Sequence, residues 1–108
     1  MGMIAIDFDD TIHLTSQPVP GKRMGPPIKG AKESLIQLKR EGHTIVIHTV
    51  WSLDRQPVIR EWLRFYGIPF DSITNVKPEA DLFVDDRAVR FVNWERALKE
   101  IHERLPNE

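Results

Sequence analysis

The chain has 108 residues, with 15 lysines and arginines against 16 aspartates and glutamates, and a formal net charge of −1. This length fits one domain with a helix-covered sheet, and the balanced charge gives no general attraction to nucleic acid or an anionic membrane. The absence of cysteine excludes disulfides and thiolate metal sites. No apolar run approaches the roughly 20 residues of a membrane span, and no basic leader precedes the first apolar run. We therefore expect a cytoplasmic protein without a membrane partner.

The first predicted element is a buried strand that ends in acids. Residues 3–8 are mostly apolar, which is typical of a strand covered on both faces. Asp7, Asp9 and Asp10 crowd its end, where a parallel sheet opens into a crevice. Three carboxylates in one place repel each other unless a cation or a shared proton compensates.

The segment that follows, residues 12–27, holds four of the eight prolines and shows no apolar period, which predicts a loop. Long loops in small domains are often functional, and this one directly follows the acids. We expect it to act as a flap over the crevice. His13, Lys22 and Arg23 are its candidate contacts to a substrate.

Helices and strands then alternate. Apolar residues on one face predict a helix over residues 28–40. A β-branched run at 44–49 predicts a second buried strand, which ends in Thr49 and in His48, a further candidate contact to a substrate. Another helix should continue to Gly67. Its expected cap is Ser52 or Asp54, with Pro57 in its first turn.

The last part of the chain repeats the pattern of strand and acids. After a short strand at 72–74, residues 81–84 predict a buried strand that leads directly into Asp85 and Asp86. A short extended piece is expected at 88–91, before a final amphipathic helix from Asn93. We expect the three tryptophans to lie in the core.

This order of elements predicts an α/β layer fold with a mainly parallel sheet, formed as a single domain over residues 1–108. Right-handed crossovers place all strand ends on one edge of such a sheet. That edge would collect Asp7, Asp9, Asp10, His48, Thr49, Asp85 and Asp86, with Lys77 in the loop before the last strand.

These residue types suit phosphoryl transfer assisted by a divalent cation. Carboxylates from two strands make an oxygen-rich site for Mg²⁺, which lets an anionic substrate approach an acid. One carboxylate can attack phosphorus, and a second can move the proton, with an effect of about 10²–10⁴-fold. Thr49 can donate a hydrogen bond to a phosphoryl oxygen, and Lys77 can neutralise its charge.

At four places the chain resembles the haloacid dehalogenase (HAD) superfamily. Residues 7–11 (DFDDT) look like its first motif, DxDxT after an apolar strand. Residues 45–49 are similar to the second, an apolar strand ending in Thr or Ser. Lys77-Pro78 resembles the third, a lysine often followed by proline, and residues 82–86 resemble the fourth, an apolar strand ending in paired acids. All four stand in family order.

The resemblance implies a three-layer Rossmann-like (HAD-like) fold and Mg²⁺-dependent phosphomonoester hydrolysis through an aspartyl-phosphate intermediate. Asp7 matches the nucleophile and a metal ligand. Asp9 matches the general acid/base, whose backbone carbonyl also binds the metal. Thr49 and Lys77 match the groups that bind the phosphate of the substrate.

The resemblance assigns the remaining acids less uniformly. Asp85 matches the other side-chain metal ligand, while Asp86 is either a ligand or a holder of an outer-shell water. Thr11 matches a position that shapes the motif loop. Asp10 stands where many members have glycine, and its role stays open.

Departures from the family pattern bear on the substrate. The gaps that hold cap domains contain only the 12–27 loop and one helix, so the chain resembles capless members. Their open sites admit bulky phosphorylated substrates, or are closed by another subunit of a homo-oligomer. Lys77 lies only eight residues before Asp85, which leaves little room for the usual helix. Val50-Trp51 stands where an arginine is common, and Arg55 is a candidate replacement.

Three other interpretations compete. A receiver domain gathers similar residues around Mg²⁺, but its acidic pair comes first in the chain, whereas here it comes last. A degenerate member that only binds a phosphorylated partner should have lost a motif residue, yet all are present. A nucleic-acid-end phosphatase fits an open site, but the neutral charge and the lack of an aromatic–basic stripe give it little support. The sequence leaves the natural phosphorylated substrate open.

Overall fold

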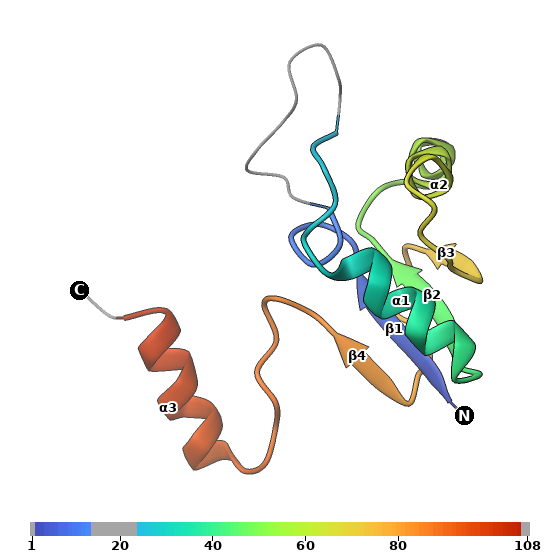
Figure 1. The fold of residues 1–108 in the computed structure, drawn as a ribbon. Coiled ribbons are helices and arrows are strands. Elements are labelled where there is room, and N and C mark those ends of the chain that lie inside the picture. Colours follow the sequence, from blue (N-terminus) through green and yellow to red (C-terminus); the bar gives the residue numbers. More distant parts are fainter. Residues whose placement is uncertain (1, 14–23, 107–108) are drawn as a thin grey trace.

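A computed structural model describes residues 2–13 and 24–106 (Figure 1). The order of its elements is β1 (Met3–Asp7), α1 (Ala31–Arg40), β2 (Thr44–His48), a short 3-10 helix η1 (Leu53–Arg55), α2 (Gln56–Phe65), β3 (Ser72–Thr74), β4 (Leu82–Val84) and α3 (Trp94–Arg104). No helix among the described residues is long and apolar enough to cross a membrane. Most of the proposed flap, including Lys22 and Arg23, lies outside the described residues.

The four strands form one parallel sheet in the order β3-β2-β1-β4. Asp7 stands opposite His48 of β2, and Ile6 stands opposite Val84 of β4. The residues after these strands therefore meet at one edge. This arrangement confirms the α/β fold with a parallel sheet and is consistent with the Rossmann-like three-layer architecture expected from the sequence.

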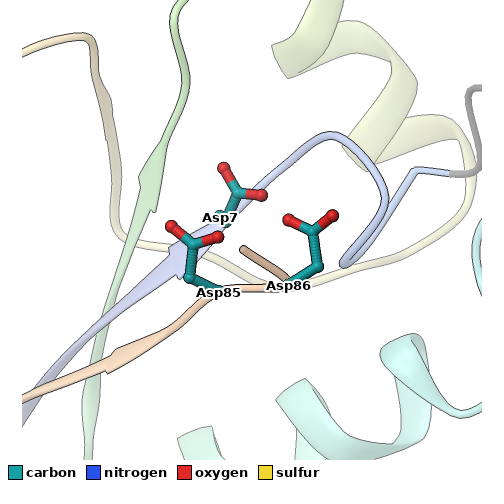
Figure 2. Close-up of side chains that lie close together, drawn as sticks. All are labelled: Asp7, Asp85 and Asp86. Atoms are coloured by element: carbon teal, nitrogen blue, oxygen red, sulfur yellow. The ribbon is translucent and has the colours of Figure 1, made fainter. Parts of the chain in front are cut away.

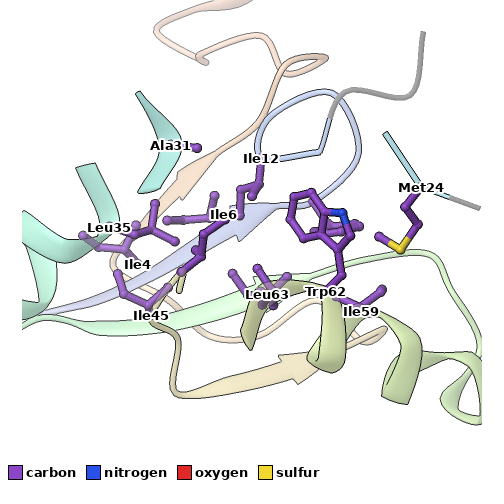
Figure 3. Packing of buried hydrophobic residues seen from close by; sticks show 13 residues of the cluster. Ile4, Ile6, Ile12, Met24, Ala31, Leu35, Ile45, Ile59, Trp62 and Leu63 are labelled. Atoms are coloured by element: carbon purple, nitrogen blue, oxygen red, sulfur yellow. The ribbon is translucent and has the colours of Figure 1, made fainter. Parts of the chain in front are cut away.

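The core fills one face of the sheet. Ile6 on β1 and Ile47 on β2 are paired in register and point to the same side. They belong to a buried cluster that also contains Leu35 of α1 together with Trp62 and Leu63 of α2 (Figure 3). Both helices thus hold the central strands in place, and the carboxyl end of β1 is correspondingly fixed.

The second half of the fold is less covered than expected. The interpretation of residues 81–84 as a buried strand is wrong, because Leu82 is 64% exposed and Phe83 44% exposed. β4 is an edge strand that pairs with β1 alone, and α3 lies apart from the sheet (Figure 1). For the same reason Trp94 on α3 is exposed, while Trp62 is buried as expected.

Helix boundaries follow local chemistry with some corrections. The Asn93 side chain accepts a hydrogen bond from the Arg96 backbone N–H at 2.9 Å, which confirms the expected start of α3. Asp54 does not cap α2, because the chain first makes η1 after Ser52. Residues 88–91, where a short extended piece was expected, belong to no helix or strand.

Asp71 fastens the beginning of β2. Its Oδ2 accepts the Ile45 backbone N–H at 2.7 Å and lies 2.7 Å from the Lys39 ammonium. These two contacts, the backbone one foremost, hold the pKa of Asp71 below its ordinary value of 3.8. The contribution of this carboxylate to stability is therefore complete above that ordinary value and is lost as the pH falls through the lower folded-state pKa.

We expect Asp71→Ala to lower the free energy of unfolding by about 1–2 kcal/mol at neutral pH, because it leaves a strand N–H without its acceptor. Urea denaturation measures the change, and Asp54→Ala on exposed η1 should cost less than about 0.5 kcal/mol. The difference between wild type and Asp71→Ala should shrink at low pH. Equal stability of the two proteins at neutral pH would contradict this role.

Candidate functional site

Three carboxylates meet where β1 and β4 end. Asp7 closes β1, and Asp85 and Asp86 directly follow the neighbouring parallel strand β4. One oxygen atom from each of the three residues lies within 4.8 Å of the others. Figure 2 shows the three side chains gathered around one space at the edge of the sheet. This is the arrangement that the convergence of parallel strand ends predicts.

Burial and the two neighbouring acids raise the proton affinity of Asp7. The pKa of Asp7 rises from 3.8 to about 7, chiefly because the side chain is partly withdrawn from water. A hydrogen bond to the Asp86 side chain and the negative charges of Asp85 and Asp86 raise it further, while Arg87 acts in the opposite direction. Without a cation, the cluster thus tends to hold a proton near neutral pH.

A tight turn after β1 keeps the residues that follow Asp7 at the same edge of the sheet. The Phe8 carbonyl accepts backbone N–H groups from Thr11, Ile12 and His13 at 3.4, 2.9 and 3.0 Å. Asp10 has a φ of 61°, in the left-handed region that short acidic side chains tolerate and glycine prefers. Glycine would adopt this backbone conformation at position 10 without steric cost.

The side chains of Asp7 and Asp85 also accept hydrogen bonds from residues close to them in the sequence. The Thr11 hydroxyl donates to Oδ2 of Asp7 at 3.4 Å. Oδ1 of Asp85 accepts the Arg87 backbone N–H at 2.9 Å, in a short turn that directs the chain away from β4. Each of these contacts leaves carboxylate oxygens available at the cluster.

The side chain of Asp9 makes its hydrogen bonds outside the cluster of Asp7, Asp85 and Asp86. Its Oδ1 lies 3.1 Å from Nδ1 of His13, and its Oδ2 accepts the indole N–H of Trp51 at 3.1 Å. Both partners are close to the strand ends: His13 completes the turn after β1, and Trp51 lies three residues after β2. The side chain of Asp9 is therefore separate from the three clustered carboxylates, although it lies in the same short segment as Asp7.

The predicted phosphate binders lie beside the same edge. Thr49 is buried, and its Oγ1 accepts the Trp51 backbone N–H at 3.2 Å, which leaves its own hydroxyl proton free to donate. The Lys77 ammonium lies 5.1 Å from the centre of the Phe83 ring. A cavity of about 630 Å³ contains Lys77 together with His48 and Asp85 in its wall.

A solved structure of a conserved protein from Bacteroides thetaiotaomicron is similar to this chain, with a TM-score of 0.65 and 30% sequence identity. The similarity covers 95% of this chain and 91% of that one. The chain belongs to the family of this conserved protein. No protein-family model matches the chain, and no curated protein matches it.

Membership of this family establishes a shared fold, and the chemistry at its strand ends depends on the side chains that this chain carries there. Three carboxylates with oxygens a few ångströms apart are the donor set that hard divalent cations such as Mg²⁺ prefer. Of the residues expected to bind metal through side chains, the structure brings Asp7 and Asp85 together and adds Asp86 to them. The position of Asp86 in the cluster suits both of its expected roles, as a ligand or as the holder of an outer-shell water.

The residues expected to contact a substrate lie in different parts of the structure. His48 lies on the cavity wall with Lys77. Arg55 stacks on Trp51, with its guanidinium carbon 4.6 Å from the ring centre. His13 is buried, which leaves it little surface to offer a substrate. From the sequence, Trp51 was expected to be a core residue and a departure from a family pattern, and its bond to Asp9 was missed.

Proposed function

We propose that this protein is a Mg²⁺-dependent phosphatase that hydrolyses phosphomonoesters through an aspartyl-phosphate on Asp7. The observation that carries the proposal is the cluster of Asp7, Asp85 and Asp86 at the ends of two adjacent parallel strands. It combines with the HAD-like order of the motifs around it. Asp7, Asp85 and Asp86, with the backbone carbonyl of Asp9, are the groups that would hold Mg²⁺.

In the first step of the proposed reaction, a carboxylate oxygen of Asp7 attacks phosphorus and the bond between phosphorus and the leaving oxygen breaks. Asp9 gives its proton to that oxygen. Bound Mg²⁺ would supply charge neutralisation between the acids and the phosphate. In the second step a water attacks the phosphoryl group, Asp9 takes back a proton, and phosphate leaves Asp7.

The phosphate-binding groups would act from the β2 end and from the cavity. The Thr49 hydroxyl would donate to a phosphoryl oxygen, and Lys77 would offset its charge. Lys77 now stands over Phe83, so substrate binding would draw its flexible side chain across the cavity toward the acids. Arg55, held on Trp51, is the cation placed to contact a part of the substrate beyond the phosphate.

The main alternative is a catalytically weak module that only binds a phosphorylated partner. The retained nucleophile and proton donor favour an enzyme over this module. A further cavity of about 360 Å³ gives little support to a nucleic-acid-end phosphatase, because its wall mixes Arg90, Arg96 and Lys99 with two glutamates. Closure of the site by a second copy of the chain stays a proposal that the oligomeric state in solution would test.

We expect the purified protein to release phosphate from at least one member of a broad phosphomonoester panel in the presence of Mg²⁺. Chelation should abolish the release, and added Mg²⁺ should restore it. Colorimetric detection of phosphate is the measurement. Inactivity across the panel, combined with tight binding of a phosphorylated ligand, would instead favour the binding module.

A further inference from the structure

The Asp9 carboxylate is held by two nitrogen donors from different parts of the chain. His13 Nδ1 meets one oxygen and the Trp51 indole N–H meets the other, each at 3.1 Å. A carboxylate has about four lone-pair positions, so both oxygens keep room for a further proton or hydrogen bond. The two bonds fix the direction of the carboxylate and leave its capacity to move a proton intact.

The His13 ring is fixed from its other side. The Gly25 backbone N–H donates to Nε2 at 2.8 Å, so this nitrogen is an acceptor and the ring proton lies on Nδ1, facing Asp9. The ring is 4% exposed and stacks on Phe8 with centroids 5.2 Å apart. The Trp62 indole N–H in turn donates to the Gly25 carbonyl at 3.0 Å. His13 is therefore locked in one orientation and one tautomer.

Trp51 connects Asp9 with the phosphate-binding side of the site. Its backbone N–H donates to the Thr49 hydroxyl oxygen, while its indole N–H donates to Asp9. Its ring also packs edge-on against Phe8, with centroids 6.3 Å apart. One residue thus contacts both a proposed phosphate binder and the proposed acid/base.

We propose that His13 and Trp51 are positioning residues that aim the Asp9 carboxylate at the leaving oxygen of the substrate. This inference rests on the proposed phosphatase function and deepens it. Holding a catalytic group in its working direction before the substrate arrives lowers the barrier, and a misplacement of about 1 Å costs on the order of 10²-fold in rate. His13 and Trp51 themselves need not touch the substrate.

The experiment compares two substrates that differ in their need for an acid. A 4-nitrophenyl phosphate leaves with little protonation, whereas a simple alkyl phosphate needs a proton on its leaving oxygen. We expect His13→Gln and Trp51→Phe to lower kcat/KM for the alkyl phosphate by about 10–100-fold, and for the aryl phosphate by less than about threefold. A purely structural defect would reduce both values equally.

Two matched variants separate the hydrogen bonds from packing. The amide of His13→Asn reaches the place of Nδ1 and should recover most of the alkyl phosphate activity, whereas His13→Gln places its amide near Nε2. Trp94→Phe, on exposed α3, should leave both substrates unchanged. Thermal unfolding of each variant checks that it is folded.

An NMR measurement needs no substrate. The indole proton signal of Trp51 should shift when Asp9→Ala removes its acceptor, while that of Trp94 should not. An unmoved Trp51 signal would overturn the inference, as would equal losses on the two substrates with active wild type. Inactivity of wild type toward both substrates would overturn the proposed function, and this inference with it.

Discussion

Replacing Asp7 by asparagine should reduce phosphate release by at least about 10³-fold, the largest effect expected of any single substitution in this chain. Asn has nearly the same shape but lacks the anionic oxygen that would attack phosphorus. Steady-state phosphate release from the best substrate of the panel measures the loss. In wild type, rapid acid quenching should also trap a phosphorylated protein, and the variant should trap none.

The loss should not come from unfolding. Because Asp7 is partly buried beside Asp85 and Asp86, its charge costs stability above its pKa of about 7. The neutral Asn removes that cost, so the variant without metal should be at least as stable as wild type at about pH 8. Asp54→Asn, on exposed η1, is the matched control and should retain full activity. Substantial turnover by Asp7→Asn would sink the nucleophile assignment.

The three-acid cluster could be predicted from sequence because its cause is topological. Parallel strands joined by right-handed crossovers end on the same edge, so acids placed after two such strands have to converge. Asp7 is the last residue of β1 and Asp85 follows β4, and these two strands are neighbours in the sheet. The only further requirement was that both runs form strands, and their apolar sequences made that clear.

The environment of Asp9 could not be predicted in the same way. Its bond to His13 depends on a turn in which Asp10 takes a left-handed conformation, and its bond to Trp51 joins residues 42 positions apart. No periodic pattern in the sequence predicts either contact. The presence of Trp51 just after Thr49, at the end of a strand that faces the same edge, was the one available hint.

The exposure of α3 could not be predicted from the spacing of its apolar residues. The spacing of Trp94, Leu98 and Ile101 correctly predicted an amphipathic helix. Such a pattern shows that a helix has an apolar face, but it does not identify the surface that covers that face. Here these three side chains are 69%, 49% and 36% exposed, because α3 lies apart from the sheet.

Binding of Mg²⁺ should depend steeply on pH below neutrality. Asp7, with a pKa raised to about 7 in the protein without metal, shares a hydrogen bond with Asp86 that a cation would have to replace. Ligand carboxylates must lose their protons before they bind a cation. We therefore expect the affinity for Mg²⁺ to weaken about tenfold for each pH unit below about 7, and to be nearly constant above about pH 8.

The raised pKa of Asp7 also affects the stability of the protein without metal, and in the direction opposite to that of a carboxylate whose pKa is lowered by folding. Between the ordinary value of 3.8 and about 7, the folded protein without metal holds a proton that the unfolded chain has released. Its stability should therefore fall as the pH rises through this range, and Mg²⁺ should restore stability most strongly at the upper end. Thermal unfolding with and without Mg²⁺ at several pH values measures both trends.

Calorimetry separates this proton from other effects of pH. In two buffers of different ionisation enthalpy, Mg²⁺ binding at about pH 6 should release close to one proton, and at about pH 8 almost none. Asp7→Asn should bind Mg²⁺ more weakly but with a nearly flat pH profile, because the titrating group is gone. A wild-type affinity that does not change between about pH 5.5 and 8 would show that Asp7 does not hold the metal. If Asp7→Asn keeps the wild-type slope, the proton belongs to another group, and Asp85 and Asp86 would be the next residues to replace.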